Sequence, residues 1–196
     1  PEAAKVLFDL SDNDAYGDPG EPVMETRPSG ETVAVQDGDA IYLAGDGASE
    51  GGDRPFLDRF SLSTLKRDRL FHCEEGRYER FLAFAQGLRT QALVRSESKT
   101  DPPNLYMLNL ASGSRRKLTD YRDPTPELTR VTKELVKYSR KDGVPLSGTL
   151  YLPPGYTAGT RLPALVWAYP LEYSDSSTAG QVRGSTNTFP RVTGAS

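Results

Sequence analysis

One short segment has the residue types and spacing of a catalytic serine. Residues 47–51, GASEG, form a literal G-x-S-x-G with Ser49 at its centre. In serine hydrolases this motif lies on a sharp turn between a strand and a helix, which exposes the hydroxyl and brings helix N–H groups near the oxyanion. Here the polar residues 52–55, GDRP, follow, and then an alternating strand pattern. We therefore interpret Ser49 as part of a glycine-rich loop and not as a nucleophile.

His72 is the only histidine, so any Ser-His-Asp triad within the chain must use it. It lies at the end of a charged strand pattern, next to the single cysteine, Cys73. Neighbours in a strand point to opposite faces, which keeps the two side chains from sharing a proton. The sequence therefore predicts a structural histidine, and one His with one Cys does not favour a zinc site.

The segment that starts at Asp12, DNDAYG, begins like a calcium-binding loop. That pattern requires Asp or Asn where Tyr16 stands and Glu where Val23 stands. Because two expected ligands are missing, we favour a solvated loop in which short acidic side chains bond to their own backbone.

The composition indicates a turn-rich chain without a membrane span. Glycine (18) and proline (15) together make up 33 of 196 residues, and the hydrophobic content is 36%. The net charge of −3, with Lys and Arg spread along the chain, argues against a nucleic-acid partner. No apolar run approaches the length of a transmembrane helix or a signal-peptide core. Since the chain starts at Pro1 without Met, the compartment stays open among chloroplast, periplasm and cytoplasm.

The first two-thirds of the chain contain a repeat. The segment Phe60–Leu70 aligns with Leu108–Leu118: in each, an alternating strand and a small polar turn precede a charged strand that ends in Leu. The offset, 110 minus 62, is 48 residues, which suits one propeller blade per copy. A further apolar strand precedes each copy, at Ala40–Leu43 and Ala92–Val94. Two copies predict at most two blades.

The last third predicts a hairpin followed by a buried strand. Two alternating segments, Glu134–Ser139 and Leu146–Leu152, flank the polar turn at residues 142–143, DG. The breaker PPG at residues 153–155 ends the second strand. Ala164–Tyr169 is a continuous apolar run, the pattern of a strand buried on both faces of a mostly parallel sheet. No helix pattern that could cover such a sheet occurs before Ser196.

This hairpin region, together with AGQVRGS at residues 179–185 and VLFDLSDNDAYGDPGEP from Val6, resembles the prolyl oligopeptidase family of serine peptidases, and most of all its glutamyl endopeptidase branch. The resemblance implies a mainly β chain. Residues 1–128 would form the last, C-terminal blades of a β-propeller. Residues 129–196 would form the first strands of a truncated α/β-hydrolase (peptidase) domain.

The same resemblance implies two site residues. A tyrosine at the end of the early hydrolase strand offers its hydroxyl to the oxyanion in this family, and Tyr169 stands at the matching place. Family members often carry Gly-Gly or Ala-Gly after this tyrosine, whereas here Pro170 and Leu171 follow. Arg183 is the candidate cation for a substrate glutamate, since guanidinium binds carboxylates bidentately.

Three functions remain open from the sequence. The first is a serine endopeptidase that cleaves peptides after Glu, whose nucleophile, acid and histidine lie beyond Ser196, so that these residues alone are inactive. The second is a non-catalytic propeller-type binding module with its exposed edges covered by a partner. The third is release of an acylated N-terminus or ester hydrolysis in the parent protein. The resemblance implies no cofactor and no metal. The implied partners are a peptide substrate and the remainder of the propeller and catalytic domain.

Overall fold

The structure is a computed structural model that describes residues 6–85, 87–168 and 177–191. Within these ranges the chain is built of antiparallel strands, and the only helical element is a 3-10 turn, η1, at Leu128–Arg130. The expectation of a mainly β chain is confirmed. No helix in the described part is long and apolar enough to cross a membrane.

The first sheet has five strands in the order β1-β5-β6-β7, with β4 also pairing with β5. Its strands are β1 (Glu21–Pro22), β4 (Gln36–Asp37), β5 (Ala40–Gly45), β6 (Phe56–Ser61) and β7 (Arg67–His72). β1 and β4 pair with opposite ends of β5, so two short pieces together occupy one strand position. The small hairpin β2 (Met24–Thr26) and β3 (Thr32–Ala34) is inserted between them.

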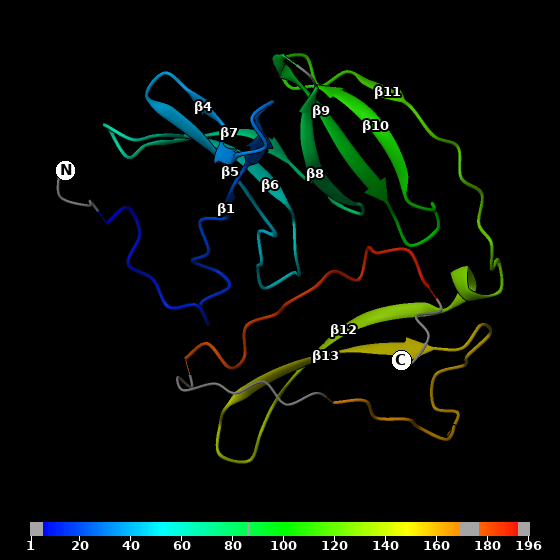
Figure 1. Ribbon diagram of the computed structural model, residues 1–196. Coiled ribbons are helices and arrows are strands. Elements are labelled where there is room, and N and C mark those ends of the chain that lie inside the picture. The colour runs from blue at the N-terminus through cyan, green and yellow to red at the C-terminus, as the bar shows by residue number, and fades with distance from the viewer. Residues whose placement is uncertain (1–5, 86, 169–176, 192–196) are drawn as a thin grey trace.

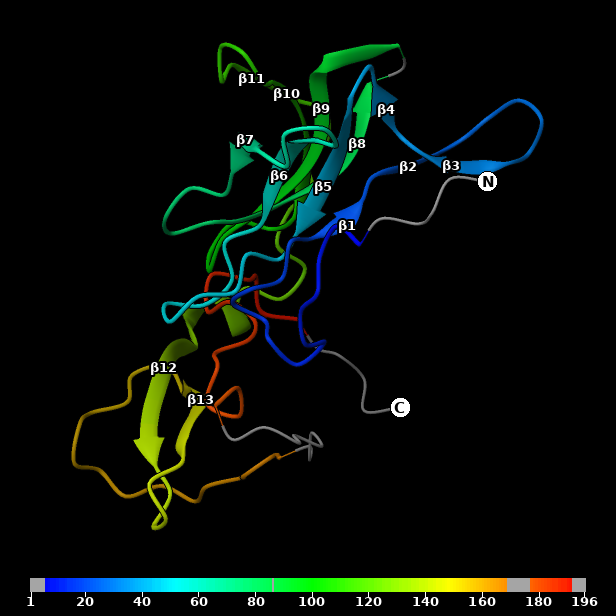
Figure 2. The same cartoon turned by 90° about the vertical axis from the view of Figure 1, so that its left-hand side faces the viewer.

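The second sheet has four strands in the order β11-β10-β9-β8, a simple meander. Its strands are β8 (Tyr78–Ala85), β9 (Leu88–Glu97), β10 (Asn104–Asn109) and β11 (Arg115–Lys117). Buried side chains of both sheets form one core cluster between them: Val35, Tyr42, Leu57 and Phe71 from the first side, and Ala92, Val94 and Leu108 from the second. The two sheets therefore pack face to face, as Figures 1 and 2 show.

The 48-residue repeat of the sequence corresponds to equivalent hairpins in the two sheets, β6–β7 and β10–β11. Equivalent backbone hydrogen bonds close the two turns. Ser61 N–H donates to the Lys66 carbonyl at 3.0 Å, and 48 residues later Asn109 N–H donates to the Ser114 carbonyl at 2.9 Å. Leu65 has φ +58° where Gly113 has φ +70°. Leu65 is the only non-glycine residue with positive φ in the described part of the chain. Two copies of one supersecondary unit thus stand side by side.

A separate hairpin follows the two sheets. β12 (Thr132–Ser139) pairs with β13 (Pro145–Leu152) through a tight turn in which Gly143 has φ +87°. The predicted hairpin and its turn are confirmed. In Figures 1 and 2 this hairpin lies apart from the sheets, below them, and the segment of residues 177–191 runs between hairpin and sheets.

The expectation of a buried strand at Ala164–Tyr169 is wrong for its described part. Residues 164–168 form no strand, and Leu165, Val166 and Trp167 are 91%, 85% and 82% exposed. A strand is stable only when neighbouring strands satisfy its N–H and C=O groups, and among the described residues none lies alongside. Tyr169 itself lies outside the described residues.

Candidate functional site

Residues 177–191, which we call the return segment, form hydrogen bonds with four other parts of the molecule. Its N-terminal half bonds to the loop of residues 13–16: the Gln181 side chain accepts from Ala15 N–H and donates to Asp14 Oδ1, both at 2.7 Å. Val182 N–H donates to the Tyr16 hydroxyl at 2.9 Å. These contacts fix the strand-free N-terminal loop against a segment that is more than 160 residues distant in sequence.

Asp14 therefore stabilises the fold of its loop through hydrogen bonds. Its carboxylate also accepts the Gly17 N–H at 3.1 Å, as expected for a short acidic side chain that bonds to its own loop. The Gln181 hydrogen bond, followed by the Gly17 bond, lowers the pKa of Asp14. In the described ranges no group of three or more His, Cys, Asp or Glu side chains is arranged to hold a metal ion.

Arg183 extends from the same segment toward this loop. Its side chain is exposed, and Nη2 donates to the Asn13 carbonyl at 2.8 Å. Arg183 lines a pocket of about 490 Å³ whose other charged lining residues are four carboxylates: Asp12, Asp14, Asp18 and Glu21. The Arg183 guanidinium thus lies among carboxylates, and one of its N–H groups is already hydrogen-bonded to a backbone carbonyl.

The centre of the return segment contacts the glycine-rich loop of the first sheet. Asp53 N–H donates to the Gly184 carbonyl at 2.8 Å, and Asp53 is only 8% exposed. Its Oδ1 is buried and accepts no hydrogen bond in the described part of the chain. Burial raises the pKa of this carboxyl. Ionising a buried carboxyl whose oxygen has no hydrogen-bond partner costs free energy. The contact between the glycine-rich loop and the return segment therefore contains a group whose protonation affects its stability.

Ser49, in the same loop, has its hydroxyl turned inward. Ser49 Oγ donates to the Gly52 carbonyl at 2.7 Å, and no helix follows the motif. His72 is the last residue of β7 and is exposed. Among the described residues, no hydrogen bond joins it to Ser49. Burial and then the charge of Arg54 lower the pKa of His72. The geometry agrees with the loop interpretation of Ser49 and with a structural His72.

Cys73 points the other way from His72, as the strand pattern predicts, and is fully buried. Its Sγ accepts the Glu79 N–H at 3.2 Å and lies within hydrogen-bonding distance of the Glu74 and Arg77 carbonyls. Burial raises the pKa of the thiol to about 11. A nucleophilic cysteine needs a lowered pKa, so Cys73 is a structural thiol.

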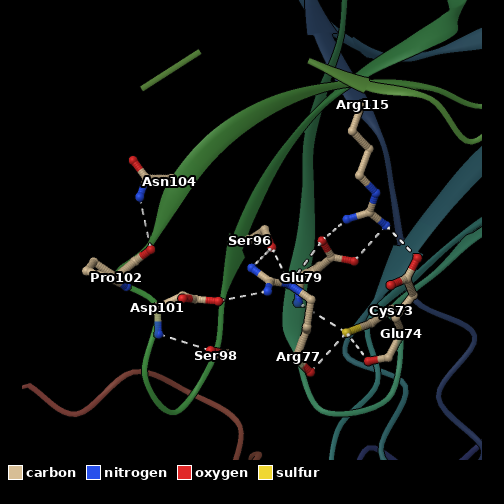
Figure 3. Close-up of polar contacts among 10 residues, drawn as sticks. All are labelled: Cys73, Glu74, Arg77, Glu79, Ser96, Ser98, Asp101, Pro102, Asn104 and Arg115. Carbon is tan, nitrogen blue, oxygen red and sulfur yellow. Dashed lines mark hydrogen bonds and ion pairs between the residues drawn. The ribbon is translucent and has the colours of Figure 1, made fainter. Parts of the chain in front are cut away.

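Next to Cys73 lies a buried ion-pair network that the sequence analysis did not find. The Glu79 side chain is 0% exposed and pairs bidentately with Arg115, whose Nη2 also reaches Glu74 Oε1 at 3.2 Å. Figure 3 shows the Arg115 guanidinium between these two carboxylates. Arg77 donates to Ser96 Oγ at 2.8 and 3.0 Å. The network links the two edge strands of the second sheet, β8 and β11.

A second buried carboxylate holds the end of the return segment. Glu97 is 1% exposed and accepts Phe189 N–H at 3.1 Å and Arg191 Nη2 at 2.7 Å, both on Oε2. Nearby, the buried Lys133 of β12 donates to the carbonyl and hydroxyl oxygens of Thr188. Burial, followed by the charge of Lys99, lowers the pKa of Lys133. The return segment is thus bonded to both the second sheet and the hairpin.

The chain has sequence relatives among known proteins. No family model matches the chain. It is 36% identical over 204 residues to a probable chloroplastic glutamyl endopeptidase of Oryza sativa subsp. japonica and 35% identical over 206 residues to one of Arabidopsis thaliana. Each match covers 96% of this chain, but 22% and 21% of the relative. The lasso peptide isopeptidase AtxE2 of Asticcacaulis excentricus is 31% identical over 136 residues, which cover 66% of this chain and 17% of that protein.

Two solved structures were also similar. The AtxE2 isopeptidase with Astexin3-dC4 bound aligns with a TM-score of 0.43 and 23% identity over 72% of this chain and 23% of that chain. Oligopeptidase B from Trypanosoma brucei, in its closed form with covalently bound antipain, aligns with a TM-score of 0.47 and 15% identity over 68% of this chain and 21% of that chain.

The chain corresponds to a segment of a member of the prolyl oligopeptidase family. Within that family, the relatives at 36% and 35% identity are both probable glutamyl endopeptidases. The chain spans about a fifth of the length of these relatives.

Proposed function

We propose that this chain contributes to a serine endopeptidase that cleaves peptides after glutamate. The observation that carries the proposal is the match to two probable glutamyl endopeptidases over 96% of the chain. In this proposal residues 1–128 are the last propeller blades and residues 129–196 begin the catalytic domain. The turn η1 at Leu128–Arg130, between β11 and β12, supports a boundary at that point.

The nucleophile, the acid and the histidine of the triad are proposed to lie beyond Ser196, so that the 196 residues alone are inactive. Two observations support this: the Ser49 hydroxyl is bonded to its own loop, and His72 is the only histidine in the chain. A triad needs an imidazole hydrogen-bonded to the attacking hydroxyl. Within the chain, Ser49 and His72 do not meet that requirement.

Tyr169 is the proposed oxyanion donor. A phenol held at a strand end can stabilise the developing charge by about 3 kcal/mol. Tyr169→Phe in the intact enzyme should lower kcat far more than it changes KM, because the contact forms only in the transition state. An unchanged kcat would remove the assignment.

Arg183 is the proposed ligand for the substrate glutamate, through N–H groups other than the one that holds Asn13. The four carboxylates in the same pocket oppose binding of an acidic ligand, so this assignment needs a direct test. Arg183→Gln in the intact enzyme should reduce cleavage after Glu about tenfold relative to cleavage after Gln. An unaltered Glu/Gln ratio leaves Arg183 with only its bond to Asn13.

A fluorophosphonate probe tests the proposal as a whole. It should label the intact protein and leave these 196 residues unlabelled, since the probe reacts only with an activated serine. Ser49→Ala is the matched control and should leave labelling of the intact protein unchanged. Labelling of the 196-residue chain that Ser49→Ala abolishes would overturn the proposal, and an unlabelled intact protein would favour a non-catalytic binding module.

A second candidate is hydrolysis of a different amide or ester bond. The match to a lasso peptide isopeptidase, 31% identical over 136 residues, favours it. A scan of the intact enzyme with linear, isopeptide-linked and N-acylated peptides separates the candidates. Preference for linear peptides with Glu before the cleaved bond supports the first; release of an acylated residue or cleavage only of the isopeptide supports the second.

A further inference from the structure

A pocket of about 470 Å³ lies where the linker after β11 meets the end of the return segment. Most of its lining is rigid and apolar: Pro102, Pro103, Pro124, Pro190, Tyr121 and Phe189. The other lining residues are Thr125 and two cations, Arg122 and Arg191, and no carboxylate is among them. We call this the proline-lined pocket. Its volume is in the range of pockets that hold small ligands, roughly 300–1,000 Å³.

Buried polar side chains hold both aromatic walls through their backbones. Asn104, 5% exposed, accepts Tyr121 N–H on Oδ1 at 2.7 Å and donates from Nδ2 to the Tyr121 carbonyl at 3.3 Å. Glu97 accepts the Phe189 N–H. The walls are therefore ordered without a ligand, which lowers the entropic cost of binding. The ring of Tyr121 is itself available for contact, since this residue is 64% exposed.

The charged part of the lining is positive. In the described residues no carboxylate lies within ion-pairing distance of Arg122. Asp120, close to it in sequence, is paired with Lys117. Arg191 uses Nη2 for Glu97, and a guanidinium has five N–H groups, so others remain for a ligand.

The other polar pockets differ in this respect. Arg183 shares its pocket with four carboxylates. Arg77 and Arg115 line a pocket of about 520 Å³, but the carboxylates of Glu74 and Asp101 line it as well. Only the proline-lined pocket, among those compared, combines apolar walls with guanidinium groups and lacks an acidic lining residue.

We propose that the proline-lined pocket binds a peptide segment in which an aromatic residue is followed by a glutamate or an aspartate. The aromatic ring packs against Tyr121 and the prolines in an offset or edge-to-face arrangement. The carboxylate accepts hydrogen bonds from Arg122 and from the remaining N–H groups of Arg191, because planar guanidinium matches carboxylate geometry. The inference concerns binding alone, so it is tested separately from the peptidase activity.

The test compares two blocked dipeptides, acetyl-Phe-Glu-amide and acetyl-Phe-Gln-amide, for binding to the full chain. Calorimetry measures the affinity, and the NMR shifts of Tyr121 report the location. The Glu peptide should bind about fivefold more tightly at low salt, as expected for partly exposed ion pairs. The preference should fall as salt screens the charges.

Three variants complete the test. Arg122→Gln should abolish the preference for the Glu peptide, whereas Arg116→Gln, an exposed arginine of β11 outside the pocket, should keep it. Tyr121→Ala should weaken both peptides about tenfold, and the fold is retained because Asn104 holds only the backbone of residue 121. The proposal is overturned if the native chain binds both peptides with equal affinity or shows no saturable binding. It is also overturned if Arg116→Gln reduces the preference for the Glu peptide as much as Arg122→Gln does.

Discussion

The backbone N–H of Asp53 donates to the carbonyl oxygen of Gly184 at 2.8 Å, and this bond joins the glycine-rich loop of the first sheet to the return segment. The fit is close, because a Cβ added to Gly52 would lie 3.0 Å from that same carbonyl oxygen, and Gly52 has φ +104°. This backbone contact and the positive φ together explain why position 52, three residues after Ser49, is a glycine.

The buried carboxyl at this contact makes stability depend on pH. Because burial raises the pKa of Asp53, the folded chain holds the Asp53 proton more tightly than the unfolded chain does. Its contribution to the free energy of unfolding is therefore greatest at low pH and falls as pH rises from the unfolded pKa through the folded one. Asp53→Asn should raise stability at pH 7 by about 1 kcal/mol and flatten this part of the pH profile. Urea unfolding between pH 4 and pH 8 measures both effects.

Asp68→Asn is the control, because Asp68 is an exposed carboxyl of β7 in the same sheet. It should change stability by no more than about 0.5 kcal/mol. If Asp53→Asn destabilises the chain at pH 7, the carboxylate has a partner that stabilises its charge, and the interpretation of its buried oxygen is wrong.

The two equivalent turns give a reciprocal prediction. Leu65 adopts φ +58°, which costs a side-chain-bearing residue about 1 kcal/mol, while Gly113 adopts φ +70° in the matching position. Leu65→Gly should raise the melting temperature, since the exposed Leu65 side chain loses little burial. Gly113→Ala should lower it, although nothing lies within 4 Å of the added Cβ, so the effect is one of backbone conformation. Calorimetry of both variants checks the signs; two shifts in the same direction would contradict the equivalence of the turns.

Local signals were sufficient for the repeated hairpins and for the hairpin β12–β13. In the hairpin β12–β13, the turn at residues 142–143 and the alternating pattern on either side are close in sequence, and together they fix the strand register. The apolar run at residues 164–168 is different, because whether it becomes a strand depends on neighbouring strands and not on its own residues. Its composition alone could not decide its structure.

The buried contacts of the site escaped prediction for a related reason. Glu79 lies 36 positions from Arg115, and Glu97 lies 94 positions from Arg191, so no periodic pattern links either pair. The return segment has no strand or helix pattern at all, yet its backbone is held by Asp53 and Glu97. A charged residue in a largely apolar strand, such as Glu79 in β8, was the one available signal of such a network.

The Glu79–Arg115 pair should be costly to break from one side. Arg115→Met leaves the fully buried Glu79 carboxylate without its bidentate partner and should lower stability by about 3 kcal/mol. The neighbouring Arg116→Met is the matched control, since Arg116 is exposed on the same strand, and should cost at most about 0.5 kcal/mol. Denaturant unfolding of both variants gives the comparison.

A double variant separates lost charge pairing from lost packing. Glu79→Gln combined with Arg115→Met removes the buried charge and should recover at least about 1 kcal/mol relative to Arg115→Met alone. If the double variant is less stable than either single variant, packing of the long side chains dominates over the desolvated charge.

Cys73 offers a direct measure of the integrity of this region. Its thiol is buried, and its pKa rises from 9.0 to about 11, so at pH 8 the folded chain carries about a hundredfold less thiolate than the unfolded chain. Only the thiolate reacts with iodoacetamide, so alkylation should be at least about a hundredfold slower in buffer than in urea. Because Cys73 is the only cysteine, mass spectrometry of the whole chain reports on this site alone.

Arg115→Met should accelerate alkylation in buffer by increasing local opening, whereas Arg116→Met should not. Rapid alkylation of the native chain would show that the region around Glu79 is open and that the ion-pair network does not seal it.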